Sequence, residues 1–243
     1  MTQNSELMTL NKFLAYAGFA SRRKAADLIK SRVVTVNHGV VTDPGYRVKP
    51  KDVIRVKGKM VARQAYVYVL FNKPRGAIST ATDEKGRTSV LDFIDVGRTR
   101  IYPVGRLDTN TTGLLLLTND GELAQRLTHP KHEVKKTYHV VLHKPISPED
   151  IELIKKGVRL SDGVVRVDDI RYMPKAPKTC LSIVLHSGKN RIIRRLMEYL
   201  GYFIEKLDRV AYAGLTKRSL SVGQWRQLTA LELSKLKKAA GLT

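Results

Sequence analysis

The spacing of apolar residues in the first quarter of the chain predicts two short helices followed by strands. Helical spacing extends over residues 10–17 and again over 22–29, where Ser21 is a suitable N-cap. Valine-rich runs then predict strands over 33–37 and 50–56. This part of the chain is therefore expected to fold as a small helix–helix–strand unit.

From residue 66 onward, strand-like runs are mixed with fewer helices, and residues 72–76 are expected to break the first strand. The predicted strands cover 66–71, 101–104, 114–118, 136–142 and 179–185. The predicted helices cover 121–126 after Asp120, 148–156, 191–200, and 230–240 after a capping box of Thr229 and Glu232. Because no regular strand–helix–strand repeat appears, the pattern predicts an α+β fold. Its core is expected to be a mixed, largely antiparallel sheet with flanking helices.

The two patterns divide the chain into a small N-terminal domain, residues 1–62, and a larger domain, residues 66–243. The polar and basic stretch 57–64 is the expected linker between them. The apolar stretches are strand-sized, and none approaches the roughly 20 residues that a membrane-spanning helix needs. Neither domain is therefore expected to enter a membrane.

The net charge of the chain indicates the class of partner that it binds. The chain has 44 Lys and Arg residues against 22 Asp and Glu residues, a net charge of +22. Residues 1–62 contain 12 of the basic and 4 of the acidic residues, so the small domain carries +8 and the remainder +14. A charge of this size indicates a polyanionic partner, with nucleic acid favoured over a membrane surface.

Cysteine and histidine usage argue against several kinds of site. Cys180 is the single cysteine, which excludes an internal disulfide and is typical of a reducing, cytoplasmic environment. The first residues lack the pattern of a secretory signal. His129 and His132 have few potential partner ligands nearby, and no phosphate-binding or dinucleotide-binding glycine motif occurs. We therefore expect neither a metal nor a cofactor, and nothing in the sequence demands more than a monomer.

Two short stretches contain candidate functional residues. Arg22, Arg23 and Lys24 begin the second predicted helix, where a helix N-terminus and basic side chains favour phosphate binding. A solvated helix face explains the same charges. Asp108 lies in "YPVGRLDTNTTGLLLLTNDGEL", close to Arg106. Turn statistics alone favour Asp108 as a turn residue. However, an acid on a phosphate-binding surface repels the ligand, which argues for a functional role of Asp108.

Five co-linear motifs resemble the RsuA/RluB-type ribosomal RNA pseudouridine synthases. They are the stretch around Asp108, "LFNKPRG" (70–76), "HPKHEVKKTYHV" (129–140), "GKNRIIRRLMEYLGY" (188–202) and "VGQWRQLT" (222–229). Residues 9–59, with "LNKFLAYAGFASRRKAADLIKSRVVTVN", resemble the alpha-L RNA-binding domain of a small-subunit ribosomal protein. The resemblance covers nearly the whole chain, and the combination of motifs is highly specific.

The resemblance implies a role for several residues. Asp108 matches the family's catalytic aspartate, and Arg106 matches the residue that fills the space left by the flipped nucleotide. Tyr138 matches the aromatic residue that lies against the uracil, and Arg194 matches the arginine that pairs with the catalytic carboxylate. Three further basic residues of the motifs are expected to contact RNA: Lys73, Arg191 and Arg195. Arg191 and Arg195 are expected to point to other faces of the helix than Arg194.

The resemblance also implies a reaction, in which a uridine of ribosomal RNA is isomerised to pseudouridine without a cofactor. Large-subunit RNA, naked or in an assembly intermediate, is the favoured substrate, and small-subunit RNA is the alternative. Ile192 stands where the family often has Gln or Glu, and residues 109–111 vary, which leaves the target uridine open. Two other classes of function remain: a non-catalytic factor for ribosome assembly, and an N-glycosidase that would release free uracil.

Overall fold

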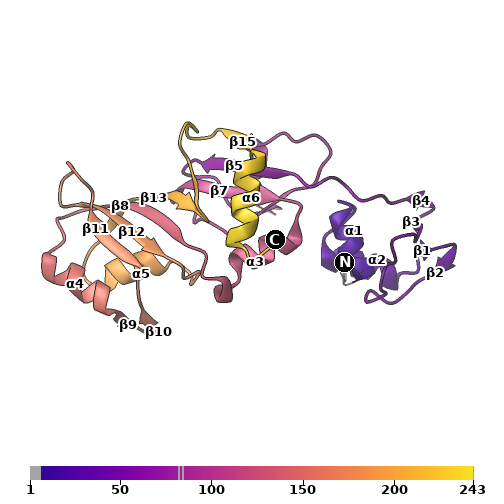
Figure 1. The fold of residues 1–243 in the computed structure, drawn as a ribbon, viewed down its shortest axis with the longest axis horizontal. Coiled ribbons are helices and arrows are strands. Elements are labelled where there is room, and N and C mark those ends of the chain that lie inside the picture. Colours follow the sequence, from indigo (N-terminus) through magenta and orange to yellow (C-terminus); the bar gives the residue numbers. More distant parts are fainter. Residues whose placement is uncertain (1–6, 82, 84, 243) are drawn as a thin grey trace. The chain divides into compact units, whose positions relative to one another are not determined.

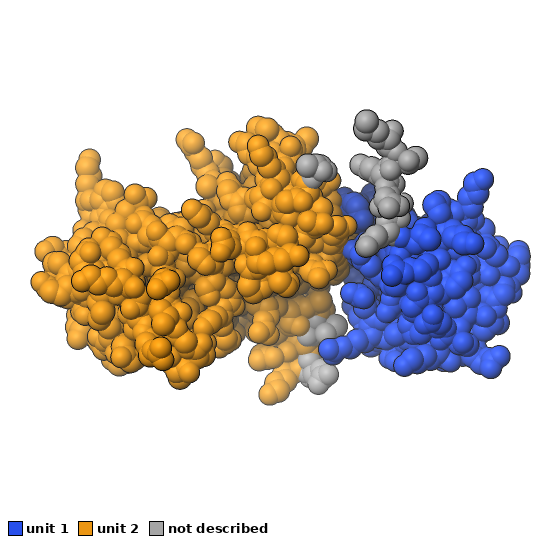
Figure 2. Space-filling view, turned by 60° about the horizontal axis from the view of Figure 1, so that its bottom comes forward, with its two compact units in different colours: residues 1–67, 97–101 blue, residues 68–96, 102–243 orange. Residues whose placement is uncertain are grey.

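A computed structural model describes residues 7–81, 83 and 85–242. The chain forms two compact units, shown in different colours in Figure 2. Unit 1 comprises residues 1–67 and 97–101, and unit 2 comprises residues 68–96 and 102–243. Within the described residues, no helix combines the length and apolar character needed to cross a membrane.

Unit 1 has the helix–helix–strand order expected from its apolar spacing. Helix α1 (Leu10–Tyr16) and helix α2 (Arg22–Lys30) precede a small antiparallel sheet in the order β2-β1-β3-β4. The strands are β1 (Val34–Val36), β2 (Gly39–Val40), β3 (Ile54–Val56) and β4 (Lys59–Met60). The Ser21 hydroxyl accepts a hydrogen bond from the Lys24 amide, so the expected N-cap of α2 is confirmed.

Unit 2 is built on one large sheet, whose main path is β11-β12-β8-β13-β7-β5-β15. Strand β14 pairs with β13, and β6 pairs with β7. The strands are β5 (Tyr68–Lys73), β6 (Tyr102–Pro103), β7 (Thr112–Thr118), β8 (Lys136–Leu142), β11 (Asp169–Tyr172), β12 (Cys180–Leu185), β13 (Ile204–Tyr212), β14 (Leu215–Thr216) and β15 (Trp225–Gln227). Only β13 and β7 pair in parallel within the described sheet. The predicted α+β class with a mixed, largely antiparallel sheet is confirmed.

Helices cover the two halves of this sheet separately (Figure 1). Helices α4 (Pro148–Lys156) and α5 (Ile192–Tyr199) lie beside β11, β12 and β8, with the hairpin of β9 (Val158–Leu160) and β10 (Gly163–Val165). Helices α3 (Gly121–Thr128) and α6 (Ala230–Ala239) lie beside β7 and β5. Two short 3-10 turns, Val90–Phe93 and Pro130–His132, complete the unit. Each half has its own cluster of buried apolar side chains.

The two halves of the sheet meet where β7 runs parallel to β13. At this point Gly113 has φ +105°, and a Cβ atom there would lie 2.3 Å from the Arg209 carbonyl oxygen. Only a residue without a side chain allows the two backbones to approach so closely. This contact brings the loop before β7 next to β8, β13 and the start of α5.

Several strands differ from the prediction. Strand β5 continues through Lys73 instead of breaking at residue 72, and β9, β10, β11, β13, β14 and β15 were not predicted. Charged residues at Glu205, Lys206 and Asp208 interrupt the apolar alternation of β13, and this hides the strand in the sequence.

Candidate active site

Asp108 lies in the loop between β6 and β7, and hydrogen bonds on both sides fix this loop. The Ser79 hydroxyl accepts from the Leu107 amide at 3.2 Å and donates to the Leu107 carbonyl oxygen at 3.0 Å. The Thr111 amide donates to the Asp108 carbonyl oxygen at 3.0 Å, which closes a tight turn. The Asp108 side chain is 34% exposed, so its carboxylate is held on a rigid support and still accessible.

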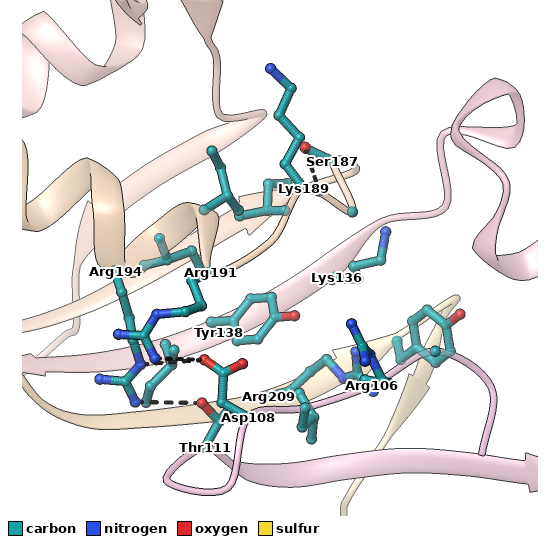
Figure 3. Close-up of a pocket in the computed structure, with 18 of the residues that line it drawn as sticks. Arg106, Asp108, Thr111, Lys136, Tyr138, Ser187, Lys189, Arg191, Arg194 and Arg209 are labelled. Carbon is teal, nitrogen blue, oxygen red and sulfur yellow. Dashed lines mark hydrogen bonds and ion pairs between the residues drawn. The ribbon is translucent and has the colours of Figure 1, made fainter. Parts of the chain in front are cut away.

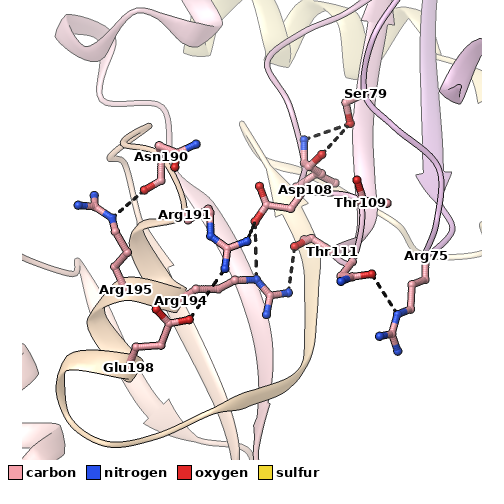
Figure 4. A network of polar contacts seen from close by, with 12 residues as sticks. Arg75, Ser79, Asp108, Thr109, Thr111, Asn190, Arg191, Arg194, Arg195 and Glu198 are labelled. Carbon is pink, nitrogen blue, oxygen red and sulfur yellow. Dashed lines mark hydrogen bonds and ion pairs between the residues drawn. The ribbon is translucent and has the colours of Figure 1, made fainter. Parts of the chain in front are cut away.

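Two arginines from the start of α5 flank this carboxylate (Figure 4). The Arg194 Nε atom and the Arg191 Nη1 atom each lie 3.6 Å from Asp108 Oδ2. Arg194 also donates from Nη2 to the Thr111 hydroxyl at 3.4 Å. The expected proximity of Arg194 to Asp108 is present, and Arg191 adds a second positive charge at the same distance.

Arg191 does not point away from the site, so that part of the sequence interpretation is wrong. It is the N-cap residue of α5 and has a left-handed backbone, φ 47° and ψ 32°. This uncommon conformation for a residue with a side chain directs its guanidinium toward Asp108. A helical wheel cannot show this, because Arg191 lies just outside the helix.

Burial affects the ionisation of Arg194. Desolvation lowers the pKa of Arg194, and the neighbouring Arg191 charge lowers it further, while Asp108 acts in the opposite direction. The Arg194 Nε atom is buried and makes no hydrogen bond. The Asp108 carboxylate is thus the charge that compensates this buried guanidinium.

The predicted substrate-binding residues surround one cavity of about 180 Å³, whose lining residues all belong to unit 2 (Figure 3). Asp108 and the exposed Arg106 come from the loop before β7, and Tyr138 comes from β8. Arg194 of α5 and its N-cap residue Arg191 also line the cavity. The four residues that the motifs single out, Asp108, Arg106, Tyr138 and Arg194, therefore line the same cavity.

Lys73 is not available to RNA, and its assignment as an RNA contact is corrected. Its side chain is completely buried at the end of β5. Its ammonium donates to the carbonyl oxygens of Pro74 at 2.9 Å, Thr109 at 3.3 Å and Thr111 at 2.9 Å. Two of these acceptors belong to the loop that carries Asp108, so hydrogen bonds from Lys73 hold that loop in place.

The other predicted RNA contacts lie outside the cavity. Arg195 forms a bidentate pair with Asp162 at 3.0 Å and donates to the Asn190 carbonyl oxygen, so it joins α5 to the β9–β10 hairpin. Arg22, Arg23 and Lys24 are exposed in the first turn of α2 in unit 1. Their contact with RNA stays a prediction.

Sequence reasoning missed three basic residues of the cavity, Lys136, Lys189 and Arg209. Lys136 precedes Tyr138 by two residues on β8, so strand parity places both side chains on the same face and could have indicated it. Arg209 lies on β13, which gave no strand signal. The cavity thus combines one accessible carboxylate with an excess of positive charge.

Comparisons with known proteins agree with this arrangement. Residues 67–199 match the model of the RNA pseudouridylate synthase family, and residues 8–54 match that of the S4 domain. The Bacillus subtilis (strain 168) ribosomal large subunit pseudouridine synthase B is 46% identical over 235 residues, which cover 95% of this chain and 96% of that protein. The Pseudomonas aeruginosa protein of the same name is 37% identical over 242 residues, covering 96% of this chain and 62% of that protein. A crystal structure of a pseudouridylate synthase matches 94% of this chain and 99% of its own, with a TM-score of 0.67 and 27% identity.

Proposed function

Because the chain belongs to the RNA pseudouridylate synthase family, we propose that it isomerises a uridine of large-subunit ribosomal RNA through Asp108. One observation supports this most strongly: an accessible carboxylate, flanked by two arginines, faces a cavity that also contains Tyr138 and Arg106. The names of the relatives from Bacillus subtilis and Pseudomonas aeruginosa support the choice of subunit.

Asp108 begins the reaction at the sugar of the flipped uridine. Its ionised carboxylate attacks C1′ as a nucleophile or removes a proton from C2′ as a base, and either step releases the uracil from C1′. The uracil then turns and its C5 bonds to C1′, which displaces the Asp108 carboxylate from C1′ on the first route and is accompanied by return of the proton to C2′ on the second. The C5 proton then leaves, and N1 gains a proton. Arg191 and Arg194 orient the Asp108 carboxylate for its part in the reaction. The isomerisation involves no net oxidation or reduction, so it requires no redox cofactor.

Arg106 and Tyr138 hold the nucleotide outside the helix. Flipping a uridine costs a few kcal/mol of stacking and pairing. Arg106 is exposed, and its planar guanidinium can occupy the vacated space in the stack. The Tyr138 ring lines the cavity and packs against the uracil, with its hydroxyl available for proton transfer.

The N-terminal domain, residues 1–62, adds affinity for RNA to the catalytic domain, residues 66–243. The match to the S4 domain and the exposed cluster Arg22, Arg23 and Lys24 support this division of labour. The first turn of α2 presents free backbone amides and a positive dipole end to a phosphate. The protein acts as a monomer in the cytoplasm on ribosomal RNA or an assembly intermediate.

The decisive variant is Asp108→Asn, which keeps the shape of the side chain and removes its charge. We expect pseudouridine formation to fall by about a thousandfold or more, because the reacting group is lost. RNA affinity should stay equal or rise slightly, since a negative charge leaves an RNA-binding cavity. The measurement is tritium release from ribosomal RNA labelled at uridine C5, together with RNA affinity by filter binding.

Glu149→Gln is the matched control, since it removes one exposed acid of the same unit outside the cavity. Normal tritium release by Asp108→Asn would contradict the catalytic assignment. Release of free uracil by the unaltered protein would identify an N-glycosidase instead. Mapping pseudouridine in cells with and without the gene tests the subunit: a site lost from small-subunit RNA would overturn our choice.

A further inference from the structure

The cavity contains a second pair of cations, Lys136 and Arg209, which is separate from the pair on Asp108. The Lys136 ammonium donates to the carbonyl oxygens of Val134 at 3.0 Å and His186 at 2.7 Å. The Arg209 Nε atom donates to the Leu114 carbonyl oxygen at 2.7 Å. Among the described residues, neither cation forms an ion pair. Neither positive charge is therefore paired with an acid at salt-bridge distance within the described part of the protein.

Arg209 is buried to an extent that makes this lack of compensation costly. Its residue is 3% exposed, and its Nη2 atom is buried with no hydrogen-bond partner. A guanidinium keeps its charge in proteins, and a buried charge without a counterion is unfavourable. The bond to Leu114 links β13 to β7, but a neutral donor such as a glutamine amide could make that link. The hydrogen bond to Leu114 therefore does not by itself require a charge at this position.

The register of β8 and β13 places both cations beside the base-binding part of the cavity. Arg209 lies directly opposite Tyr138, and Lys136 lies directly opposite Tyr212. The Arg209 guanidinium also lies 4.7 Å from the centre of the Tyr212 ring. Figure 3 shows Lys136, Tyr138 and Arg209 around the same cavity as Asp108. A uracil that packs against Tyr138 would thus lie next to these two charges.

The two cations also influence each other and stay close to one acid. Desolvation and, to a lesser extent, the Arg209 charge lower the pKa of Lys136 to about 8, against an opposite effect of Asp168. Asp168 is engaged elsewhere, because its carboxylate is hydrogen-bonded to His186 Nδ1 at 2.8 Å. The protein therefore tolerates an unfavourable pairing of like charges at this end of the cavity.

The proposed reaction creates a negative charge that matches this pair. When the bond between C1′ and N1 breaks, both electrons stay on N1, and the detached uracil is an anion whose charge is shared with O2 and O4. Attack by Asp108 on C1′ and removal of a C2′ proton both produce this anion. The anion is consumed when C5 bonds to C1′, and the C5 proton then leaves. A site that stabilises the anion accelerates either route.

We propose that Arg209 and Lys136 form an anion site for the carbonyl oxygens of the detached uracil and lower the barrier to its release. This inference rests on the proposed function, since it names two further groups for the same reaction. It explains why a buried and a half-buried cation, neither of them in an ion pair, face the cavity, and it is independent of the route that Asp108 takes.

The test compares two leaving groups in variants that lack one cation, Arg209→Gln and Lys136→Gln. Each variant acts in single turnover on ribosomal RNA with uridine or 5-fluorouridine at the mapped target. Fluorine makes the detached uracil a weaker base, so it needs less stabilisation. The rearranged nucleoside keeps its fluorine, so the loss of 5-fluorouridine reports bond breaking and reattachment without the final deprotonation.

We expect a loss of about a hundredfold or more with uridine, as for removal of one group that stabilises a developing anion. The loss with 5-fluorouridine should be at least severalfold smaller. Arg209→Lys keeps the charge and should recover part of the rate, whereas Lys206→Gln removes an exposed charge from the same strand and should leave both rates unchanged.

Equal losses with both substrates, or a loss in RNA affinity alone, would overturn the inference and identify a structural role or a site for a backbone phosphate. If Arg209→Gln does not fold, Lys136→Gln gives the same comparison, with circular dichroism as the check on folding. A failure of the proposed function is distinct, because the unaltered protein would then form no pseudouridine.

Discussion

Lys73 is a single buried residue that supports the loop carrying Asp108. Its buried ammonium is bonded to carbonyl oxygens on both sides of the turn that follows Asp108. Desolvation lowers its pKa from an ordinary value of 10.5 to about 8, although the Asp108 charge raises it in part. The protein therefore holds a charged lysine in the interior at some cost, and a proton leaves it more readily than it leaves an exposed lysine.

This lowered pKa predicts how stability depends on pH. Between about pH 8 and 10.5 the unfolded chain binds a proton at Lys73 that the native protein has lost, so the free energy of unfolding rises with pH in this window. The variant Lys73→Met lacks this contribution of Lys73 to the pH dependence of the free energy of unfolding. Relative to that variant, we expect the free energy of unfolding of the unaltered protein to increase by about 2 kcal/mol from pH 7.5 to 9.5.

Urea unfolding followed by the fluorescence of Trp225 measures this difference. Trp225 is the single tryptophan, and it lies on β15 in unit 2, the unit that contains Lys73. Other lysines, including Lys136, are present in both proteins, so subtraction removes their contributions. Parallel curves for the two proteins would show that the pKa of Lys73 is not lowered in the native state.

At the scale of elements, the parallel contact between β7 and β13 assembles the cavity. Asp108 precedes β7, whereas Tyr138, Arg209 and the arginines of α5 belong to the other half of the sheet. The contact requires Gly113, since a Cβ atom would lie 2.3 Å from Arg209 O and 2.6 Å from both Arg209 N and Asp208 Oδ1. Two of these three atoms belong to the backbone of Arg209, which cannot move away as a flexible side chain can.

Gly113→Ala should therefore destabilise unit 2 by about 3–5 kcal/mol, combining overpacking with a positive φ. Gly214→Ala is the matched control: Gly214 has φ +81°, but a Cβ atom there would meet nothing within 4 Å, so about 1 kcal/mol is expected. The urea midpoint from Trp225 fluorescence compares the two. Equal destabilisation would mean that backbone conformation, and not the close approach, makes Gly113 necessary.

Elements with regular local signals were predictable from the sequence. Helix α4 and strand β8 have the predicted bounds, and the capping box of Thr229 and Glu232 begins α6 as expected. Strand β13 was missed because charged residues interrupt its alternation, and one of them, Asp208, is paired with Lys217, a contact that the sequence pattern does not show. Arg209 could not be placed for the same reason.

Motif resemblance predicted more of the site than periodicity did. The motifs singled out Asp108, Arg106, Tyr138 and Arg194, and these residues line one cavity although they come from three separate segments. The resemblance could not show that Arg191 turns toward Asp108, because this depends on a left-handed backbone at one residue. Nor could it show that Lys73 is buried, since a basic residue in a motif gives no information about its exposure.

At the scale of the whole molecule, the net charge of +22 is spread over both units. Such a charge attracts any polyanion, so it supplies affinity and fast association more than selectivity. The exposed cluster Arg22, Arg23 and Lys24 differs from the remaining charge because it stands at a capped helix N-terminus. Contacts fixed by such geometry should release counterions upon binding, whereas diffuse charge should contribute less.

Replacing Arg22, Arg23 and Lys24 together by Gln should therefore reduce the salt dependence of RNA binding. Each lost phosphate contact lowers the slope of log affinity against log salt by about 0.7–0.9, so a decrease of about 2 is expected for three contacts. Glutamine keeps the helix propensity, and the Ser21 cap bonds a backbone amide that the substitutions do not remove. Filter binding to ribosomal RNA over a range of salt concentrations gives the slope.

The matched control replaces Lys235, Lys237 and Lys238 of α6 by Gln and removes the same net charge from unit 2. If affinity depends on total charge alone, both triple variants will change the slope equally, and the proposed role of the N-terminal domain is contradicted. If the α2 cluster contacts phosphates directly, only its variant changes the slope. Single-turnover rates at saturating RNA should then be unchanged, because Asp108 and its cavity lie entirely within unit 2.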